Sequence, residues 1–488
     1  MSRVVVVGHG MAGARFVQEL RARDPEHEVT VLSAESEVAY NRILLSSVLA
    51  GALTPAEVEV VPSAWYAAED VDLHTGVEVT RINRANRWAH TNNGDTFEYD
   101  HLVLATGSRP WIPPVDGLLL ADGGLADGVA VFRTLADCRA ITRRLESARQ
   151  PVRRAVVLGG GLLGLEAARG LAGRGVDVTV VHPVGRLMER QLDEAAGRVL
   201  ARTIAALGMR VLLNRQAVAW HGNGEPAERT LELDDGTCVP ADLVIVACGV
   251  RANTDVAVSA GLEVEHAIVV DDRLTSVTDP RIHAIGECSQ YDDQVYGLVA
   301  PAWEQAAVLA DILTGGDARY SGSRVVTRLK AAGVDLATLG DADLNGTAAA
   351  DDTSEVISFA DPARGTYQKI VIQDDRVTGA IMLGETDTAG TVIQLYDRDA
   401  VVPHDRRALI FPGVLDAGVA SNVTDLPDDA VVCRCNGVSC GEVRAACADG
   451  ARTAGEVAVA TRATTGCGSC AGDVDALVQQ AESLEVAL

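Results

Sequence analysis

Residues 3–20 read RVVVVGHGMAGARFVQEL, and residues 153–182 repeat the same design as RRAVVLGGGLLGLEAARGLAGRGVDVTVVH. Each stretch predicts a β-branched strand, a glycine turn of the form G-x-G-x-x-G and a helix. The first glycine permits the tight turn, the second lets backbone approach a pyrophosphate, and the third lets the helix pack closely on the strand. Two such units predict two bound dinucleotides. The glycines concerned are Gly8, Gly10, Gly13, Gly159, Gly161 and Gly164.

The residue after the second strand of each unit bears on which dinucleotide is bound. Glu35 follows the apolar strand EVTVLSA (28–34), where a carboxylate accepts hydrogen bonds from a ribose. His182 takes the corresponding place in the second unit, and Arg186 lies near enough in sequence to meet a 2′-phosphate. The sequence therefore leaves NADH and NADPH both open for the second unit and favours NADH.

Composition limits the classes of function. The chain has 488 residues and a formal net charge of −26, and a surface that acidic repels nucleic acid and anionic membranes. No apolar run of about 18 residues predicts a membrane span. A strand begins almost at the first residue, where a secretory signal would need a longer apolar stretch, so we expect a cytoplasmic protein. The length predicts several domains.

Three further strands end in small-residue loops, as expected at the nucleotide-binding edge of a parallel sheet. They are YDHLVLATGSRP (99–110), ADLVIVACGVRAN (241–253) and RLTSVTDPRIHAIGECSQY (273–291). The first precedes the second glycine turn, the second closes that unit, and the third follows it. The loop residues that we single out are Ala105, Thr106, Gly107, Gly249, Gly286 and Glu287.

This order of segments resembles the two-dinucleotide flavoprotein reductases, in which an NAD domain interrupts an FAD domain. The resemblance implies that residues 105–107 lie against FAD and that Glu287, where the family usually has Asp, reaches the ribityl chain. It also implies that the helix within VYGLVAPAWEQAAVLADIL (295–313) points its positive N-terminal end at the flavin pyrimidine. The flavin-edge candidates on this helix are Trp303, Glu304 and Gln305.

The early cysteine pair of the disulfide reductases is missing, since no cysteine precedes Cys138. The loop AYNRILLSS (39–47) resembles the flavin-contact loop of ferredoxin and rubredoxin reductases, with Ser47 where those carry a lysine. Its Arg42 suits the flavin pyrophosphate or ring oxygens. Together with GRLMERQLD (185–193) and LKAAGVD (329–335), the loop resembles the flavin half of assimilatory NAD(P)H nitrite reductase and the electron-transfer subunit of assimilatory nitrate reductase.

A cysteine cluster stands near the C-terminus. Cys433 and Cys435 form C-x-C, and Cys467 and Cys470 form C-x-x-C about thirty residues later. Four thiolates suit either a 2Fe–2S cluster or tetrahedral zinc, and the spacing alone does not choose between them. The segment resembles bacterioferritin-associated ferredoxin, which implies 2Fe–2S.

Local patterns predict the elements around these motifs. Ser439 with Glu442 and Thr453 with Glu456 have capping-box spacing, which predicts two helix starts. Apolar runs flanking Asp374 and Asp375 predict a hairpin. The fold class expected is α/β, with two Rossmann-like domains, an α+β interface domain and a small helical iron–sulfur module. The predicted boundaries are 1–118 and 251–318 for the two parts of the FAD domain, 119–250 for the NAD(P)H domain, 319–415 for the interface domain, 416–430 for a linker and 431–488 for the 2Fe–2S module.

We therefore expect an oxidoreductase that takes a hydride from NAD(P)H and passes electrons through FAD to a 2Fe–2S cluster, without a side-chain nucleophile. The resemblance implies a nitrate or nitrite reductase as acceptor. The chain lacks the length for a molybdopterin or sirohaem domain, so we expect that catalytic subunit to be separate. Two alternatives stay open: the flavoprotein subunit of an amino-acid, opine or cyanide-forming dehydrogenase, and a zinc-stapled interaction protein on an inactive flavoprotein. The oligomeric state is also open.

Overall fold

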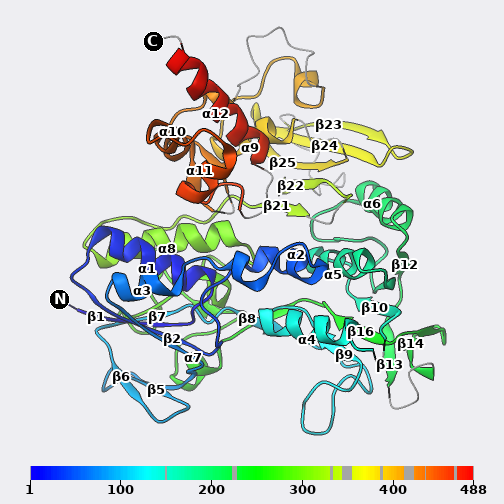
Figure 1. Ribbon diagram of the computed structural model, residues 1–488, viewed down its shortest axis with the longest axis horizontal. Coiled ribbons are helices and arrows are strands. Elements are labelled where there is room, and N and C mark those ends of the chain that lie inside the picture. The colour runs from blue at the N-terminus through cyan, green and yellow to red at the C-terminus, as the bar shows by residue number, and fades with distance from the viewer. Residues whose placement is uncertain are drawn as a thin grey trace.

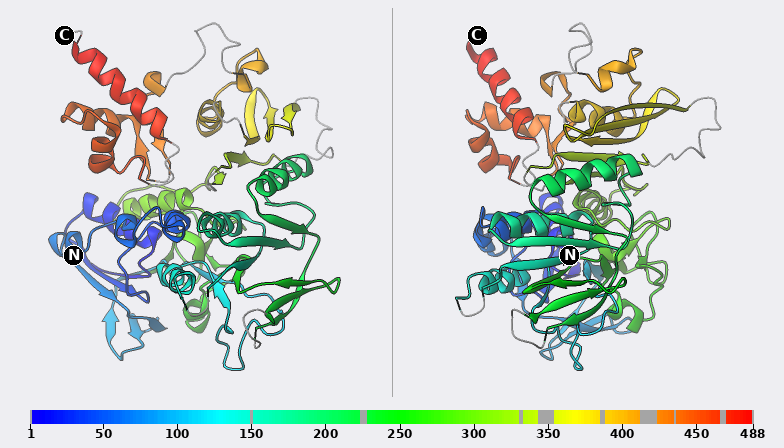
Figure 2. Two further views of the ribbon diagram at one scale, coloured as in Figure 1. Left: turned by 45° about the vertical axis from the view of Figure 1, so that its right-hand side comes forward. Right: turned by 90° about the vertical axis from the view of Figure 1, so that its right-hand side faces the viewer.

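The structure is a computed structural model. It describes residues 2–148, 151–222, 228–329, 333–342, 354–384, 388–411, 423–434, 436–465 and 470–486. Two units, each built around a parallel sheet, lie side by side in the lower part of Figure 1, and a further sheet and the C-terminal helices lie above them (Figures 1 and 2). Within the described part of the chain, no helix combines the length and the apolar character needed to cross a membrane.

The first unit is a parallel five-stranded sheet in the order β19-β7-β1-β2-β3. Its central strand ends in four consecutive buried valines, the continuous apolar run expected of a strand covered on both faces. The edge strand β19 comes from much later in the chain than the other four strands, so the chain leaves this unit and returns to it. The elements are β1 (Arg3–Val7), β2 (Glu28–Ser33), β3 (Val71–Thr75), β7 (His101–Leu104), β19 (Ile282–Ala284), α1 (Met11–Arg23), α2 (Leu45–Ala50), α3 (Ser63–Ala68) and α8 (Val299–Leu313).

The second unit repeats this plan as a parallel sheet in the order β12-β11-β10-β16-β9. It is joined to the first unit by an antiparallel pair, β8 with β17, whose strands follow the loops after β7 and β16. The elements are β8 (Ser108–Pro110), β9 (Val129–Val131), α4 (Leu135–Leu145), β10 (Arg154–Leu158), α5 (Leu162–Gly173), β11 (Asp177–His182), α6 (Glu194–Ala206), β12 (Arg210–Leu213), β16 (Leu243–Val246) and β17 (Val250–Ala252).

Small sheets extend both units. Two are antiparallel and three-stranded, and the third is a parallel pair of two-residue strands. The elements are β4 (Val79–Asn83), β5 (Trp88–Thr91), β6 (Thr96–Glu98), β13 (Ala217–His221), β14 (Thr230–Leu233), β15 (Cys238–Pro240), β18 (Ile268–Val269), β20 (Ser289–Gln290) and α7 (Asp255–Ser259).

The interface domain is an antiparallel sheet in the order β21-β22-β25-β24-β23, packed on α9. The hairpin expected at Asp374 and Asp375 is confirmed: both residues have positive φ, 49° and 58°, as a two-residue type I′ turn requires. The elements are β21 (Val326–Leu329), β22 (Leu336–Gly340), β23 (Ser354–Asp361), β24 (Thr366–Gln373), β25 (Arg376–Leu383) and α9 (Ala389–Asp397).

A buried polar cluster connects this sheet to the second unit. Asp193 caps α6 by accepting from the Ala196 amide, and it also accepts from the Tyr367 hydroxyl at 2.7 Å. The ammonium of Lys369 lies 3.2 Å from the same carboxylate, and both charged side chains are buried. These contacts lower the pKa of Asp193, although burial opposes its ionisation. The interface domain is thus held to the second unit by a paired buried charge.

The C-terminal module packs three helices over its own apolar core. Both predicted capping boxes are confirmed, at Ser439 with Glu442 and at Thr453 with Glu456. The predicted linker 416–430 falls partly outside the described residues, which resume at residue 423. The fold class expected from the sequence is confirmed. The elements are β26 (Val431–Cys433), β27 (Val438–Ser439), α10 (Cys440–Ala448), α11 (Ala454–Thr461) and α12 (Ala471–Val486).

Candidate functional site

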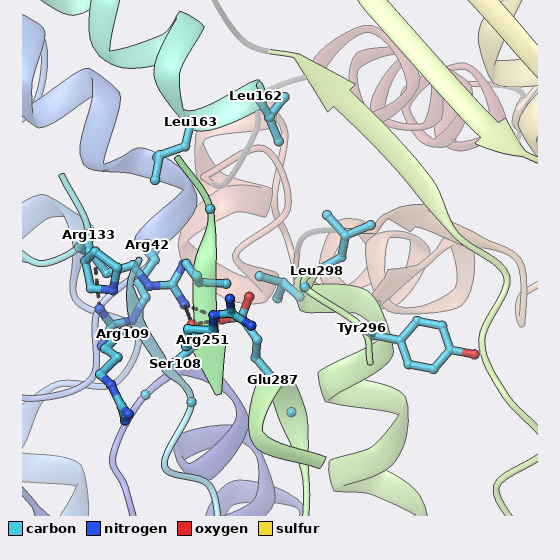
Figure 3. Close-up of a pocket in the computed structure, with 18 of the residues that line it drawn as sticks. Arg42, Ser108, Arg109, Arg133, Leu162, Leu163, Arg251, Glu287, Tyr296 and Leu298 are labelled. Carbon is cyan, nitrogen blue, oxygen red and sulfur yellow. Dashed lines mark hydrogen bonds and ion pairs between the residues drawn. The ribbon is translucent and has the colours of Figure 1, made fainter. Parts of the chain in front are cut away.

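A single cavity of ≈ 2130 Å³ runs along the carboxyl ends of the strands in both units. Ligands of open α/β sheets bind at this edge. Figure 3 shows the part of the cavity where Arg133, Ser108 and Glu287 meet. The sequence-predicted residues that line the cavity are Gly8, Gly10, Glu35, Arg42, Ala105, Thr106, Gly107, Gly159, Gly161, His182, Gly249, Gly286, Glu287 and Cys470.

The first glycine turn leaves no room for side chains at two of its positions. Gly8 has a φ of +106°, and a Cβ there would lie 2.2 Å from the Ala105 carbonyl oxygen. A Cβ on Gly13 would lie 2.2 Å from the carbonyl oxygen of Gly8, so α1 is pressed against the turn. Gly10 lines the cavity, and a Cβ placed on it meets nothing within 4 Å. A side chain at Gly10 would therefore occupy ligand space and leave the fold intact.

The second turn has the same constraints. Gly159 has a φ of +112°, and its Cβ would lie 2.2 Å from the Ala247 carbonyl oxygen. A Cβ on Gly164 would lie 2.1 Å from the carbonyl oxygen of Gly159. Gly161 also lines the cavity with no atom within 4 Å of its Cβ position. Both turns thus present a bare backbone face to the cavity.

Glu35 follows β2, and its carboxylate is held by the loop that the sequence suggested for flavin contact. The Tyr40 hydroxyl donates to Glu35 at 2.7 Å, and Arg42 forms an ion pair with the same carboxylate. Arg42 also donates to the backbone carbonyl of Arg133 at 3.1 Å. Burial raises the pKa of Tyr40, so its hydroxyl stays protonated and able to donate. A carboxylate and a guanidinium are therefore held together in the part of the cavity wall that the first unit forms.

Glu287 lies in a polar group that the sequence alone did not reveal. Its carboxylate forms an ion pair with Arg133 and accepts from the Ser108 hydroxyl at 2.5 Å. Arg133 also donates to Ser108 at 2.7 Å. Arg133 was missed, although it lies two residues after the end of β9 and so at the same edge of a parallel sheet as the predicted loops. That position was the available signal.

The three candidates on α8 are not among the residues that line the cavity, whose wall at this helix is formed by Leu298, Val299, Ala300 and Ala302. Gln305 is buried and accepts from the Gly286 amide at 2.7 Å, so it holds the turn before Glu287. The Trp303 ring packs under the guanidinium of Arg15, which lies 5.3 Å from the ring centroid. Glu304 accepts from the Ser323 hydroxyl, and burial raises its pKa.

At the second unit, His182 is buried at the end of β11. The Gly160 amide donates to its Nδ1 at 3.1 Å, and its Nε2 lies 3.0 Å from a carboxylate oxygen of Glu189. Arg186 donates from Nε to the Leu192 carbonyl at 2.9 Å and from Nη2 to the Glu189 carbonyl at 3.2 Å. Glu189 was not singled out, because the segment GRLMERQLD (185–193) was used only for its family resemblance and no role was given to its acid.

The described cysteines of the C-terminal cluster are Cys433 and Cys470, and both are buried. Cys435 and Cys467 lie outside the described residues, so the four-thiolate arrangement stays a prediction. The side-chain amide of Asn436 lies 3.7 Å from the sulfur of Cys433 and is oriented as a donor. Buried sulfurs with amide donors suit an iron–sulfur cluster, whose sulfurs accept such hydrogen bonds.

The module contacts both the first unit and the interface domain. Arg434 forms an ion pair with Asp397 of α9, and Gln394 of the same helix donates to the Val431 carbonyl at 3.0 Å. On the other side, Arg462 donates to the Glu59 carbonyl at 2.9 Å. In this arrangement Cys470 lines the same cavity as the two glycine turns.

Polar atoms in the cavity wall fit a polar ligand. Among the described residues, Nδ1 of His9 and Nε of Arg133 are buried and have no hydrogen-bond partner, and both residues line the cavity. His9 contacts the Tyr66 hydroxyl at 2.7 Å through Nε2, and burial lowers its pKa to about 4. Buried groups of this kind are normally satisfied, so a dinucleotide between the bare glycine faces fits the site.

Cys138 and Cys248, which lie outside the C-terminal cluster, do not fit a nucleophile. Burial raises the pKa of Cys138 to about 12 and that of Cys248 to about 11, so both thiols are neutral at ordinary pH. Reactive cysteines need a lowered pKa.

The chain belongs to the pyridine nucleotide-disulphide oxidoreductase family, whose sequence pattern matches residues 2–306. The pattern of the rubredoxin NAD⁺ reductase C-terminal domain matches residues 326–397, and that of the BFD-like 2Fe–2S binding domain matches residues 431–480. The protein is therefore an NAD(P)H-linked flavoprotein oxidoreductase with a 2Fe–2S domain, and its cofactors are FAD, NAD(P)H and a 2Fe–2S cluster.

Among curated relatives, the chain is 35% identical over 480 residues to the NAD(P)H nitrite reductase of Bacillus subtilis (strain 168), covering 98% of this chain and 57% of that protein. It is 34% identical over 480 residues to the assimilatory nitrate reductase electron transfer subunit of the same strain, covering 98% and 59%. The nitric oxide reductase FlRd-NAD(+) reductase of Vibrio vulnificus (strain CMCP6) is 32% identical over 342 residues, covering 69% and 85%. The chain thus spans less than two thirds of the length of the first two relatives.

Solved structures share the fold. The covalent putidaredoxin reductase–putidaredoxin complex matches with a TM-score of 0.72 and 27% identity over 81% of this chain and 93% of that one. NADH:rubredoxin oxidoreductase from Clostridium acetobutylicum matches with a TM-score of 0.65 and 21% identity over 83% and 96%, which shows the fold alone.

Proposed function

We propose that this protein oxidises NADH or NADPH and delivers the electrons, through FAD and its own 2Fe–2S cluster, to a separate catalytic reductase of nitrate or nitrite assimilation. The observation that carries the proposal is the shared cavity. Its wall contains Gly10 of the first turn, Gly161 of the second and Cys470 of the module. Three redox carriers held along one cavity are suited to passing electrons within a single chain.

Each part of the cavity wall has a proposed role. The first turn, with Glu35 and Arg42, would hold FAD at its adenosine end, and Arg133 with Glu287 would hold it further along. The second turn would hold the pyrophosphate of the exchanging dinucleotide. When bound, the flavin supplies the conversion between two-electron and one-electron carriers. The protein then needs to position the carriers and supply no nucleophile.

The nature of the acceptor is supported by the relatives. The protein that matches over 98% of this chain at 34% identity is an electron transfer subunit of an assimilatory nitrate reductase. A net charge of −26 also favours an acceptor with a basic docking face. We therefore propose that the electrons leave through the C-terminal module to such a reductase.

The first test is anaerobic reduction of the cofactor-replete protein, followed by its visible spectrum and by electron paramagnetic resonance. We expect NADH to bleach the flavin absorbance and to produce the signal of a reduced 2Fe–2S cluster. Glycine and an opine should leave both signals unchanged, which separates this reading from an amino-acid dehydrogenase. Iron and sulfide analysis separates it from a zinc-stapled protein. An iron signal that never responds to NADH would end the proposal.

The acceptor is tested by reconstitution. The protein is mixed with the catalytic nitrate reductase or the sirohaem nitrite reductase of the same organism, and NADH-dependent nitrite or ammonia formation is measured. Product formation with one of the two identifies the acceptor. No product with either, under conditions where dithionite drives both reductases, would refute the proposed partner and leave the internal electron transfer intact.

A further inference from the structure

In the first unit, Glu35 lies two residues after the end of β2. In the second unit, β11 ends in His182, and no carboxylate stands at its end. Because the Gly160 amide donates to Nδ1, that nitrogen is the acceptor and the imidazole proton is on Nε2. The Nε2–H group then donates to the carboxylate of Glu189 at 3.0 Å. The hydrogen bonds thus set the tautomer and tie the strand end to a carboxylate seven positions later in the sequence.

Glu189 is placed to act on a ligand. It lies in the loop between β11 and α6, and it lines the cavity together with Gly161. Its side chain is 34% exposed, whereas that of His182 is buried. A carboxylate offers about four acceptor positions. The bond from His182 therefore leaves Glu189 able to accept from both hydroxyls of a ribose.

Arg186, which the sequence offered as a partner for a 2′-phosphate, serves the loop instead. Its guanidinium donates to the backbone carbonyls of Glu189 and Leu192 at 3.2 and 2.9 Å. These bonds fix the backbone that carries Glu189. Arg186 does not belong to the described cavity wall. The loop is thus braced by Arg186 from behind and by His182 from the strand end.

Two arginines, Arg215 and Arg190, also line this part of the cavity, and a free positive charge there would attract a 2′-phosphate. Arg215 forms an ion pair with Asp235 at 2.6 Å, so its charge is already matched. Arg190 is exposed and lines the cavity next to Glu189. A 2′-phosphate beside Glu189 would place like charges together, which costs binding energy, whereas without Glu189 it would meet Arg190.

We propose that Glu189 accepts the adenosine ribose hydroxyls of the nicotinamide dinucleotide and makes the protein selective for NADH over NADPH, with His182 as a positioning residue. The inference rests on the proposed function, because it takes the second turn as the nicotinamide dinucleotide site. It moves the ribose-binding acid from the strand end, its usual place, into the following loop.

The test uses the cofactor-replete protein and its Glu189→Ala variant. The KM for NADH and for NADPH is measured with ferricyanide as acceptor, and binding of ADP-ribose and 2′-phospho-ADP-ribose is measured by isothermal titration calorimetry. We expect Glu189→Ala to weaken the binding of NADH and ADP-ribose about 10- to 100-fold. The binding of the 2′-phosphorylated ligands should weaken less or not at all. Glu194→Ala is the matched control, because Glu194 is an exposed acid of the same region outside the described cavity wall.

His182 is tested by the split between KM and kcat. We expect His182→Leu to raise the KM for NADH and leave kcat and the flavin spectrum unchanged, with partial rescue in His182→Gln, whose amide can donate to Glu189. Should His182→Leu fail to fold, the Glu189→Ala measurements decide alone. The inference would be overturned if NADH still reduced the flavin of Glu189→Ala and the variant had the same preference between NADH and NADPH as the wild type. Failure of both dinucleotides to reduce the wild type would instead overturn the proposed function.

Discussion

A Cβ on Gly8 would lie 2.2 Å from the Ala105 carbonyl oxygen, and a Cβ on Gly159 would lie 2.2 Å from that of Ala247. The two turns therefore repeat one backbone solution in two parts of the chain. Beside them the units differ. In the first unit, the carboxylate of Glu35 after β2 is held by Tyr40 and Arg42. In the second unit, β11 ends in His182, which is hydrogen-bonded to Glu189 in the following loop.

This comparison separates two requirements of dinucleotide binding. The glycines are needed because backbone atoms approach one another and the pyrophosphate, so both turns carry glycine at the same three positions. The ribose end needs only an acceptor at the right place, and either a strand end or a loop can supply one. A glycine turn therefore predicts that a dinucleotide binds, and the residues around it decide which dinucleotide.

The largest effect is expected when a side chain is introduced on the bare backbone face of each glycine turn, one turn at a time. In Gly10→Val and Gly161→Val the new side chain enters the cavity without touching protein atoms near its Cβ. We expect Gly10→Val to purify without FAD. Gly161→Val should keep FAD, with flavin reduction by NADH at least about 10²-fold slower. Absorbance of the purified proteins and stopped-flow reduction measure this. The same phenotype in both variants would mean that the two turns do not hold different ligands.

The next effect concerns how the second unit is anchored. Lys369→Met leaves the Asp193 carboxylate buried without its cation, so we expect a loss of about 3 kcal/mol in unfolding free energy. Urea denaturation followed by circular dichroism measures it. Arg198→Ala is the control, since its ion pair with Glu194 has side chains 69% and 75% exposed and should contribute less than about 0.5 kcal/mol. Equal losses in the two variants would refute the buried link.

The smallest effect tests the residue between the first two glycines, which is His9 in one turn and Gly160 in the other. The pKa of His9 is lowered by burial from 6.5 to about 4, so between these values the unfolded chain binds a proton that the folded chain does not. Stability therefore rises with pH across this window, and the loss at pH 5 is about 2 kcal/mol relative to pH 8.

His9→Asn removes this titration. The unfolding free energy of the variant, obtained from urea denaturation, should therefore differ between pH 5 and pH 8 by about 2 kcal/mol less than that of the wild type. The wild type and the variant are compared at pH 5 and pH 8. Identical slopes would show that folding does not lower the pKa of His9.

Local sequence patterns were enough to predict both glycine units, the hairpin at Asp374 and Asp375 and the capped helices of the module. Each of these depends on neighbouring residues: strand periodicity, a turn that needs positive φ, or a side chain that caps its own helix. Arg133 and Glu189 were not predicted, because their roles depend on which loops meet in space. The orientation of Trp303, Glu304 and Gln305 was equally hidden, since the packing of α8 on α1 decides which face of the helix meets the cavity.

Lysine occurs at only two positions in the chain, 330 and 369. The second of these amines is enclosed between β24 and the start of α6, next to Asp193. Acylating reagents that label exposed amines should therefore spare position 369 as long as the nucleotide unit and the sheet stay together. Modification at that residue, read by mass spectrometry, becomes a direct signal that the two have come apart.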